Sequence, residues 1–565
     1  MWTTKSQNLK GKTEITNMEH VSQLINEASD IEKKPDKVRR EDLIEAVIKE
    51  IEEQKRIITD KEGNVWLVIP PKEPGNGSMV VNLSSKEAFQ YYNRLYLERT
   101  RATIRLSHNT LKNIAESLTD SPSQRTKVYL RWAMVKNADG SSTLWHDLNR
   151  SDRIGIRATA TGWELVPLND VLFRYQGNAE VCPDPVKTDI PFIQYMDKYL
   201  RILTPRDRVI FTTILVSYML AGRQNVITIT KGSAGSGKST LGKFMGLFMQ
   251  FKSEPEGLIG GSTKFTDDQI MARISNQAHL SYDNINSLTH SDSDVLCRVA
   301  TGTELSTRKF YTEIGLVTVA RSVPTIMTAI SDLQIQPDLM DRAYIFTPDS
   351  DKNNRIDDDD LWSGIYKDFP EMYGAMLSLI SYNLAHIDEA RRTTPISELP
   401  RMSGFGLVGV AITPELNKGE YKFSSFLTEL RRKRTQSAYT SMDNDKLIFY
   451  LYQLMKSSTE DTIELTPTLL AEQINKQIKK DDPHSKSEYT HLRLPENLLQ
   501  RKPTLRDIGI DLEIQEGQYQ GRKKNIILRK VQGVFEDDSW NGIQLNNLEP
   551  ADKTNDVLEE DDYVS

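Results

Sequence analysis

Short apolar runs alternate with polar ones along most of the chain, and their spacing predicts a mixed α/β protein. The first pattern is helical and begins near Glu41, in LIEAVIKEIEEQ. Strand-like segments follow, separated by turn signals such as NADG; they include WLVIP, VYLRWAMV, TLWHDL and GWELVP. We therefore expect a polar, disordered segment over residues 1–36 and an α/β domain over residues 37–185.

The middle of the chain changes from a helical pattern to one typical of a parallel sheet. It opens on the helical block FIQYMDKYLRILTPRDRVIFTTILVSYMLAG. From Val226 to about Pro348, short apolar strands alternate with helical stretches, as in sheets whose strands are joined by crossover helices. This pattern predicts a helical lead-in and an α/β core over residues 186–400, followed by a helical lid or linker over residues 401–440.

The C-terminal part has a third pattern, which predicts a winged helix over residues 441–531. Its expected helices are KLIFYLYQLMKSS, TPTLLAEQINKQI and LPENLLQRKPTLRDIG, with Thr466 as N-cap of the second and Pro467 in its first turn. Two strands follow, DLEIQEG and RKKNIILRK. A small α+β packing module without a ligand is the alternative. The loop between the strands favours DNA, since Tyr519 stands beside the basic residues Arg522, Lys523 and Lys524.

Composition places the chain among soluble globular proteins. Its 565 residues suggest about three or four domains. No run approaches the roughly 18 apolar residues of a membrane span, and the polar first residues lack the apolar core of a secretory signal, so we expect a cytoplasmic protein without a membrane partner. The two cysteines, Cys182 and Cys297, have no His or Cys neighbours at ligand spacing, which excludes a zinc-finger DNA reader.

Charge is distributed unevenly along the chain. The net charge of -7 therefore does not argue against DNA binding, as it would if the charges were spread evenly. Residues 536–562 contain ten acids and one base, and we expect the segment 532–565 to be a disordered acidic tail. Two roles are open for this tail: it increases solubility as a disordered segment, or it binds the basic wing of the same chain in place of DNA. Without it the chain is nearly neutral, with local basic clusters that include Arg501 and Lys502. We therefore expect DNA contacts at Arg501, Lys502, Arg522, Lys523 and Lys524.

The stretch VITITKGSAGSGKSTLGKF contains the phosphate-loop pattern G-x-x-x-x-G-K-[ST]. Glycines let successive backbone N–H groups point at a phosphate, Lys238 reaches the β and γ oxygens, and the Ser239 hydroxyl ligates Mg²⁺. A β-branched strand precedes the loop and a helical pattern follows it, which is the setting that this motif requires. The expected nucleotide contacts are Gly232, Ser233, Ala234, Gly235, Ser236, Gly237, Lys238, Ser239 and Thr240.

A nucleotide hydrolase also needs an acid on a neighbouring strand to hold the metal ion. Asp283 ends the apolar strand in AHLSYDNIN, and we expect it to share the Mg²⁺ site with Ser239. Asn284 follows it, where a second acid could serve as general base. An amide can only position water, so a base must come from elsewhere or be dispensed with. The alternative for Asp283 is a helix cap before NSLTHSDSD.

Several segments occur in the order and form found in a known family. They are the phosphate loop, YDN, LCRVATG with STRKFY, VPTIMTAI and DLMDRAYIF. Together they resemble the AAA+ ATPases of phage and mobile-element replication proteins, the superfamily-three and phage-primase-type helicases, with minichromosome-maintenance-like relatives. The resemblance covers roughly Val226–Ala411 and continues more weakly on both sides. It implies ATP with Mg²⁺ and a ring of subunits on DNA.

The resemblance also implies roles for single residues. Asp283 matches the magnesium acid, and the Asp-Asn pair with Asn284 is also seen in relatives. Arg342 in LMDRA matches an arginine that projects into the ATP site of the neighbouring subunit. The chain departs from the family at Thr328, where relatives carry an asparagine as polar sensor. A hydroxyl offers one donor where the amide offers two, so the sensor role is in doubt.

The segment STRKFYTEIGLVTVARS reads as a hairpin, and its family counterpart points into the central channel. The expected contacts to a DNA strand are the bases Arg308 and Lys309, with Arg321 as a further candidate and Phe310 and Tyr311 as stacking surfaces. The acidic to apolar tip, EIG, is poorly suited to phosphate. A core hairpin with internally paired bases is the alternative.

These expectations combine into one hypothesis: an α/β protein with an AAA+ P-loop ATPase core, an α/β N-terminal domain and a C-terminal winged helix. Its function would be that of an ATP-dependent DNA helicase or replication initiator of a mobile element. A homo-hexamer would hold single-stranded DNA in its channel and duplex at the winged helix, with replication proteins as further partners. Catalysis would fall to Lys238, Asp283, Asn284, Thr328 and Arg342.

Three other functions remain to be separated from this one. Asn284 and Thr328 leave open a DNA-binding initiator or regulator that uses ATP only to assemble. A small-molecule kinase or GTP switch is disfavoured, because the chain has no N-K-x-D guanine signature and has large flanking domains. A primase has little support, because acids such as Asp147 and Asp152 are scattered.

Overall fold

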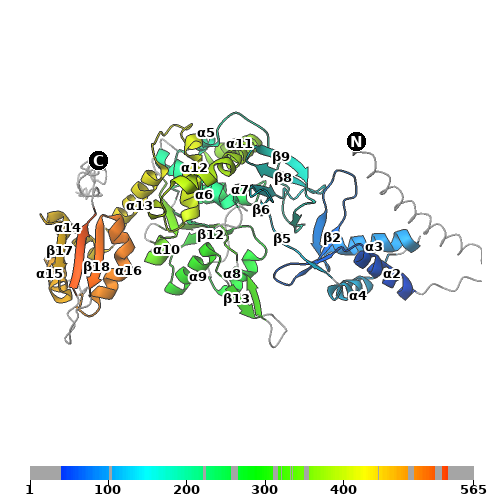
Figure 1. Cartoon of the computed structure of the whole chain (residues 1–565), viewed down its shortest axis with the longest axis horizontal. Coiled ribbons are helices and arrows are strands. Elements are labelled where there is room, and N and C mark those ends of the chain that lie inside the picture. Colours follow the sequence, from blue (N-terminus) through cyan, green and yellow to red (C-terminus); the bar gives the residue numbers. More distant parts are fainter. Residues whose placement is uncertain are drawn as a thin grey trace, which may run out of the picture. The chain divides into compact units, whose positions relative to one another are not determined.

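The structure is a computed structural model of the whole chain (Figure 1). It describes residues 40–531 except 101–104, 122, 221–223, 234, 256–264, 304, 309–315, 320, 331–332, 334, 349–355, 443–444, 482–488 and 516–524. The segments expected to be disordered, 1–36 and 532–565, lie outside the described residues. The described part forms two compact units, and the chain passes between them several times.

The first unit contains the described residues up to 131, together with 149–155 and 165–178. Its sheet has the order β3-β2-β1-β4, and a further short pair joins β5 to β10 in parallel. Three helices bury their apolar faces in one core with the sheet, around residues such as Val47, Tyr92 and Ile114. The elements are α2 (Arg40–Glu53), β1 (Ile57–Thr59), β2 (Val65–Ile69), β3 (Met79–Asn82), α3 (Lys86–Thr100), α4 (His108–Thr119), β4 (Gln124–Arg125), β5 (Val128–Tyr129) and β10 (Leu172–Phe173).

The second unit begins with residues that the sequence assigned to the first domain. Residues 132–148 and 156–164 group with the later chain, so the expected domain 37–185 is divided between the two units. They belong to a sheet of order β6-β7-β8-β9, with β6 (Trp132–Lys136), β7 (Ser142–His146), β8 (Ile154–Thr159) and β9 (Gly162–Pro167). Alternation predicts that a segment is a strand, but it does not reveal which core its apolar face joins.

A parallel four-stranded sheet forms the centre of the second unit, as the apolar runs after Val226 predict. Its order is β12-β15-β11-β16, so β15 lies between β11 and β12. The central strands β11 and β15 are buried on both faces, and their only polar residues inside the sheet are threonines and the terminal Lys231. The elements are β11 (Ile227–Lys231), α7 (Lys238–Met249), α8 (Asp267–Ile274), β12 (Leu280–Ile285), α9 (His290–Thr301), β13 (Leu305–Arg308), β14 (Leu316–Val319), β15 (Thr325–Ala329), α10 (Pro337–Met340) and β16 (Ala343–Phe346).

Helices before and after this sheet complete its core. α5 (Phe192–Tyr199) and α6 (Pro205–Met219) precede it, and α11 (Asp358–Thr393), η3 (Ile396–Glu398), α12 (Ser403–Leu416) and α13 (Phe426–Met442) follow it. Asp357 caps the N-terminus of α11 by accepting a hydrogen bond from the backbone of Asp359. Gly409 in α12 lies so close to the ring of Phe426 that a Cβ there would stand 2.0 Å from a ring carbon.

The C-terminal helices and strands have their own apolar core (Figure 1, orange and red). They are α14 (Lys446–Ser457), β17 (Thr462–Leu465), α15 (Pro467–Asp481), α16 (Leu494–Asp507), β18 (Ile510–Gln515) and β19 (Asn525–Lys530). The three helices and the β18–β19 hairpin match the expected elements. The structure adds β17, which pairs antiparallel with β19 and makes a three-stranded sheet of order β17-β19-β18.

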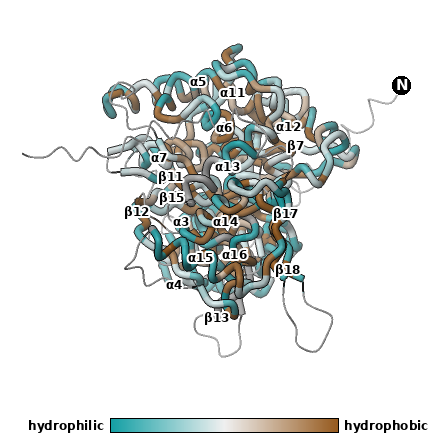
Figure 2. The backbone as a smooth tube through the Cα atoms, turned by 90° about the vertical axis from the view of Figure 1, so that its left-hand side faces the viewer, coloured by the Kyte–Doolittle hydropathy of each residue, from teal (hydrophilic) through white to brown (hydrophobic). Residues whose placement is uncertain are grey.

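Apolar stretches along the backbone are interrupted by polar ones (Figure 2). Within the described residues, no helix is both long enough and apolar enough to span a bilayer.

Candidate nucleotide-binding site

The loop between β11 and α7 has the backbone shape that its glycines predict. Gly235 and Gly237 have φ angles of 73° and 85°, which other residues adopt only with strain. A Cβ on Gly232 would stand 2.3 Å from the hydroxyl oxygen of Ser236. Gly237 caps α7 without a side-chain hydrogen bond, so the first N–H groups of the helix are left for an anion. This loop can bind a phosphate with its backbone.

Side chains of the loop lie where the motif requires them. Lys238 Nζ donates to Gly232 O at 3.2 Å, which places its charge over the loop. Thr230 on β11 donates to Lys238 O at 3.1 Å and ties the end of the strand to the start of the helix. The buried hydroxyl of Ser236 has no partner among the described residues. Ser233 is exposed and Thr240 half-buried, while Ala234 lies outside the described residues.

Asp283 is the point at which three neighbouring elements meet. Ser239 on α7 donates to Asp283 Oδ1 at 3.4 Å, and Thr328 on β15 donates to the same oxygen. The backbone N–H of Asn284 in turn donates to Thr328 Oγ1 at 2.8 Å. The structure therefore gathers Ser239, Asp283, Asn284 and Thr328, which lie in three separate stretches of the sequence, at one edge of the sheet beside the phosphate loop.

Strand β12 is irregular near its C-terminal end, where Asp283 and Asn284 leave the regular hydrogen-bond pairing with β15. The register with β15 shifts between Tyr282 and Ile285, and Asn284 adopts the left-handed conformation with φ of 57°. Asparagine adopts this conformation more readily than most residues. Asp283 and Asn284 are both exposed, whereas the residues on either side of them are buried. Asp283 lies before the capping box of α9, which Thr289 and Asp292 provide, so the alternative role of helix cap falls to other residues.

The oxygen atoms of Ser239 and Asp283 suit a hard cation. Mg²⁺ prefers oxygen ligands and is usually held by one or two protein side chains together with phosphate and water. A hydroxyl and a carboxylate 3.4 Å apart, beside a phosphate loop, fit this pattern. Among the described residues, no group of three or more His, Cys, Asp or Glu side chains could hold a metal ion without such help.

Arg342 immediately precedes β16, and its side chain is largely buried within its own chain. Its side chain is 10% exposed and forms an ion pair with Asp338 of α10, with 2.5 Å between Arg342 Nη1 and Asp338 Oδ1. Asp338 stands four residues earlier, at the spacing that allows an ion pair along a helical turn. The expected projection of Arg342 into the ATP site of a neighbouring subunit stays a prediction.

Asp338 collects hydrogen bonds from several elements. Partial burial raises its pKa, but hydrogen bonds from Arg342 and from Cys297 of α9, with the charge of Arg401, hold that pKa below its ordinary value. The pKa of the Cys297 thiol is raised, to about 12, because the thiol is buried and bonded to Asp338. Asp338 and Arg401 were not among the site residues expected from the sequence. The i,i+4 spacing of Asp338 and Arg342 was a usable signal, but Arg401 is too distant in sequence to give one.

The expected DNA contacts are placed unequally. Arg308 ends strand β13, whereas Lys309, Phe310 and Tyr311 lie outside the described residues. Arg321 donates to the backbone oxygen of Ile274 at 3.0 Å, which places this base at the foot of the hairpin.

In the C-terminal part, Arg501 donates to Asp445 at 2.6 Å and to Asn497 O at 3.1 Å, so it stabilises the start of α14. Lys502 is exposed, and Arg522, Lys523 and Lys524 lie outside the described residues.

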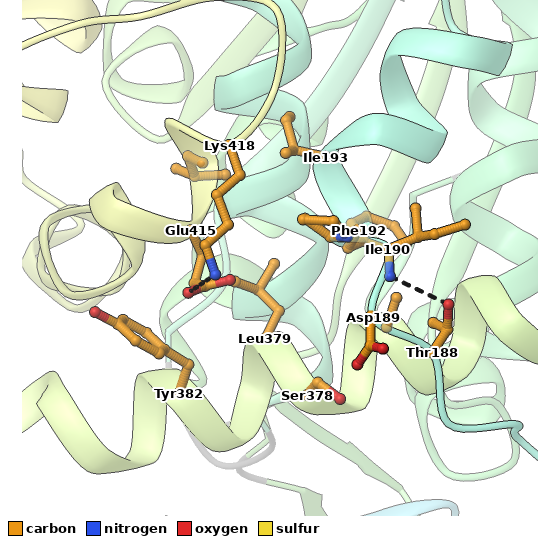
Figure 3. A pocket seen from close by; sticks show the side chains of 13 residues that line it. Thr188, Asp189, Ile190, Phe192, Ile193, Ser378, Leu379, Tyr382, Glu415 and Lys418 are labelled. Carbon is orange, nitrogen blue, oxygen red and sulfur yellow. Dashed lines mark hydrogen bonds and ion pairs between the residues drawn. The ribbon is translucent and has the colours of Figure 1, made fainter.

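A separate cavity of about 270 Å³ lies between the start of α5, the middle of α11 and the end of α12 (Figure 3). Its polar rim includes Asp189, Tyr382 and the ion pair of Glu415 with Lys418, 2.6 Å apart. It shares no residue with the phosphate loop or with the surroundings of Asp283. This cavity is therefore distinct from the candidate nucleotide site.

Comparison with known proteins places the central part of the chain near replication proteins. A family model described as "Actinomycete integrative conjugative element replication protein" matches residues 214–406, which include the phosphate loop, Asp283, Thr328 and Arg342. The chain matches no curated relative.

Two solved structures are similar to the chain at low identity. One is "SCCmec type IV Cch - active helicase", with 12% identity over 84% of this chain and 92% of that chain and a TM-score of 0.40. The other is the apo structure of the NrS-1 C-terminal region, with 12% identity over 86% of this chain and 98% of that chain and a TM-score of 0.36. Similarity at this level does not by itself assign a function.

Proposed function

We propose that the protein is an ATP-dependent DNA helicase or replication initiator of a mobile element, with an AAA+ ATPase core. The observation that carries the proposal is the meeting of Ser239 and Thr328 on one oxygen of Asp283 at the mouth of the phosphate loop. The strand order β12-β15-β11-β16 supports it, because a sensor strand between the loop strand and the acidic strand brings all three groups to one edge. The matched family model supports a role in replication.

In the proposed mechanism, different residues of the site bind the phosphates, hold Mg²⁺ and position water. The loop N–H groups and Lys238 would bind the β and γ phosphates, which orients the terminal phosphorus for attack. Ser239 and Asp283 would hold Mg²⁺, which neutralises charge on the phosphate oxygens when bound. Thr328 orients the Asp283 carboxylate and lies where a hydroxyl can position water.

Arg342 is the proposed contribution of a neighbouring copy of the chain. A guanidinium at the γ-phosphate stabilises the charge that develops during transfer. The role requires assembly, for which we propose a hexameric ring. It also requires Arg342 to turn away from Asp338, to which it is bonded in the single chain.

DNA binding is proposed for two regions. The helix–strand–helix–helix–strand–strand order of α14 to β19, with β17 beside β19, supports a winged helix that binds duplex. The β13–β14 hairpin, with Arg308 at the end of β13, is the proposed contact to a single strand. Of the C-terminal DNA candidates that the structure describes, Arg501 and Lys502, it is Lys502 that is exposed.

Two observations favour a second function, that of an initiator that assembles with ATP but does not unwind DNA. Arg342 is turned inward, and Asn284 stands where a second acid would serve as general base. Such a protein would bind DNA and ATP with little turnover.

The deciding experiment measures ATP hydrolysis and unwinding of a forked duplex by the full chain and by Lys238→Ala. We expect Lys238→Ala to lose hydrolysis by at least about a thousandfold, because the loop lysine contacts the transferred phosphate. Lys243→Ala, farther along α7, is the matched control and keeps the wild-type rate. Unwinding by the wild type supports the helicase. Binding of DNA and ATP with little hydrolysis and no strand release supports the initiator. Hydrolysis by Lys238→Ala would refute the site.

A further inference from the structure

Two arginines share the carboxylates that precede β16. Arg342 Nη1 lies 2.5 Å from Asp338 Oδ1 and donates to Asp338 O at 2.7 Å. Arg401, in the segment between η3 and α12, places its Nη1 3.3 Å from the same Oδ1 and 3.4 Å from Asp341 Oδ2. One carboxylate oxygen therefore has two cations within ion-pair distance.

The two arginines differ in exposure. The Arg342 side chain is 10% exposed, whereas those of Arg401 and Asp338 are 49% and 54% exposed. Because Asp338 faces water, its attraction for either guanidinium is screened and the ion pairs are easily exchanged. Arg342 can therefore leave Asp338 without breaking an ion pair that is shielded from water.

The guanidinium of Arg342 does not use all of its hydrogen-bond donors in this conformation. Its Nε is buried and has no acceptor among the described residues. A buried N–H without a partner costs free energy, so this orientation is a poor final environment for the guanidinium. The same side chain is the one that the proposed function assigns to the nucleotide of a neighbouring copy.

We propose that Arg401 is a positioning residue for Arg342: it neutralises Asp338 and Asp341 when Arg342 leaves Asp338 for the γ-phosphate of a nucleotide bound to a neighbouring copy. The inference rests on the proposed function and adds a partner to its intersubunit site. Arg401 does not touch the nucleotide; it acts through the carboxylates.

The need for Arg401 follows from the charges that Arg342 leaves behind. Asp338 and Asp341 stand three residues apart at the end of α10, a spacing at which like charges repel. Among the described residues, the ion pairs of Asp338 are with Arg342 and Arg401. Arg434 donates to the backbone oxygen of Asp341 at 3.3 Å and not to the Asp338 carboxylate. Cys297 also donates to Asp338, but its thiol is neutral and does not replace a cation. Without Arg401, Asp338 retains Arg342.

A double-mutant cycle tests the inference on the full chain with ATP, Mg²⁺ and single-stranded DNA. We expect Arg401→Gln to lower kcat for ATP by about fivefold, the size of one exposed ion pair, with KM and the affinity for a fluorescent ATP analogue nearly unchanged. Asp338→Asn alone keeps or raises kcat, because it releases Arg342. The double variant should return to the rate of Asp338→Asn, because the carboxylate that captures Arg342 is gone.

Matched variants exclude a merely structural role for Arg401. Arg401→Lys keeps the charge and should keep most of the activity. Arg391→Gln, which removes an exposed arginine paired with Asp388 at 2.8 Å near the end of α11, should leave kcat unchanged. If Arg401 only fastened its own segment, Asp338→Asn would not restore the rate, and that result would overturn the inference. An unchanged kcat in Arg401→Gln would also overturn it.

Arg342→Ala separates the inference from the function on which it rests. A wild-type rate for Arg342→Ala overturns the intersubunit site and this inference with it. A slow Arg342→Ala together with an Arg401→Gln that Asp338→Asn does not restore overturns the inference alone.

Discussion

The hydroxyl of Thr328 donates a hydrogen bond to Asp283 and accepts one from the backbone N–H of Asn284 at 2.8 Å. A single hydroxyl thus fixes both the orientation of the proposed metal ligand and the left-handed turn that follows it. An amide side chain could bond the carboxylate too, but the hydroxyl does so while buried within β15. This relationship gives Thr328 a role in holding Asp283 that does not depend on its contact with nucleotide.

Replacement of Thr328 by valine preserves the shape of the side chain and removes both hydrogen bonds. We expect kcat for ATP to fall about a hundredfold, as for loss of one preorganised donor in other active sites, while ATP binding through the loop persists. The free energy of unfolding should fall by about 1 kcal/mol. Thr325→Val, on the same strand, is the control. Equal rates for the two variants would contradict the assignment.

Lys502 and Arg501 are adjacent in sequence but differ in their surroundings, so their loss should have different effects. Lys502→Gln should weaken duplex binding similarly for all sequences. It should also reduce the slope of log affinity against log salt concentration by about 1, because one fewer counterion is released. Arg501→Gln should instead lower the melting temperature, because it breaks the pair with Asp445 at the cap of α14. Binding titrations at several salt concentrations and thermal melts separate the two. A larger loss of DNA affinity in Arg501→Gln would reverse the assignment.

Asp507, at the end of α16, should make stability depend on pH. Burial raises its pKa to about 6, although the charge of Arg434 lowers it. A carboxyl whose pKa is higher in the folded state stabilises the fold when protonated, and this contribution is lost as pH rises through about 6.

We therefore expect Asp507→Asn to be more stable than the wild type at pH 7.5 by about 1–3 kcal/mol and nearly equal to it at pH 4. Denaturant unfolding at both pH values measures the difference. Asp511→Asn, in β18, is the control. A variant that is less stable than the wild type at pH 7.5 would show that the pairing with Arg434 outweighs the burial of the charge.

Gly409 should be intolerant of any side chain. Its Cβ would stand 2.0 Å from the ring of Phe426, which is itself buried, so Gly409→Ala forces α12 and α13 apart. We expect a loss of about 1–3 kcal/mol in the free energy of unfolding, as in other overpacked cores. Gly404→Ala, in the first turn of the same helix with open space around it, should be neutral or slightly stabilising. Thermal or denaturant melts of both variants provide the comparison.

The backbone shape of the phosphate loop and the place of Asp283 at the end of a strand were predictable because their signals are local. A strand, a glycine pattern and a helix are consecutive in sequence, and Asp283 follows an apolar run directly. The parallel sheet was predictable for the same reason. The bonds among Ser239, Asp283 and Thr328 follow once β11, β15 and β12 lie side by side, because the helix that carries Ser239 starts just beyond the end of β11.

Features that depend on distant packing were not predictable. Strand β17 is short and half-exposed, and its partner β19 lies about sixty residues later, so no local pattern revealed it. The inward turn of Arg342 depends on Asp338, and the proximity of Arg401 depends on how the segment before α12 passes α10. The division of the first domain likewise depends on which core each apolar face joins.

The first unit is discontinuous in sequence, since its strand β10 comes after segments that belong to the second unit. β10 pairs with β5, which ends more than forty residues earlier. During synthesis, the first unit therefore cannot complete its pairing until Leu172 and Phe173 have left the ribosome. An N-terminal fragment ending at residue 131 would lack this strand, whereas a fragment that reaches residue 178 would contain every segment of the unit.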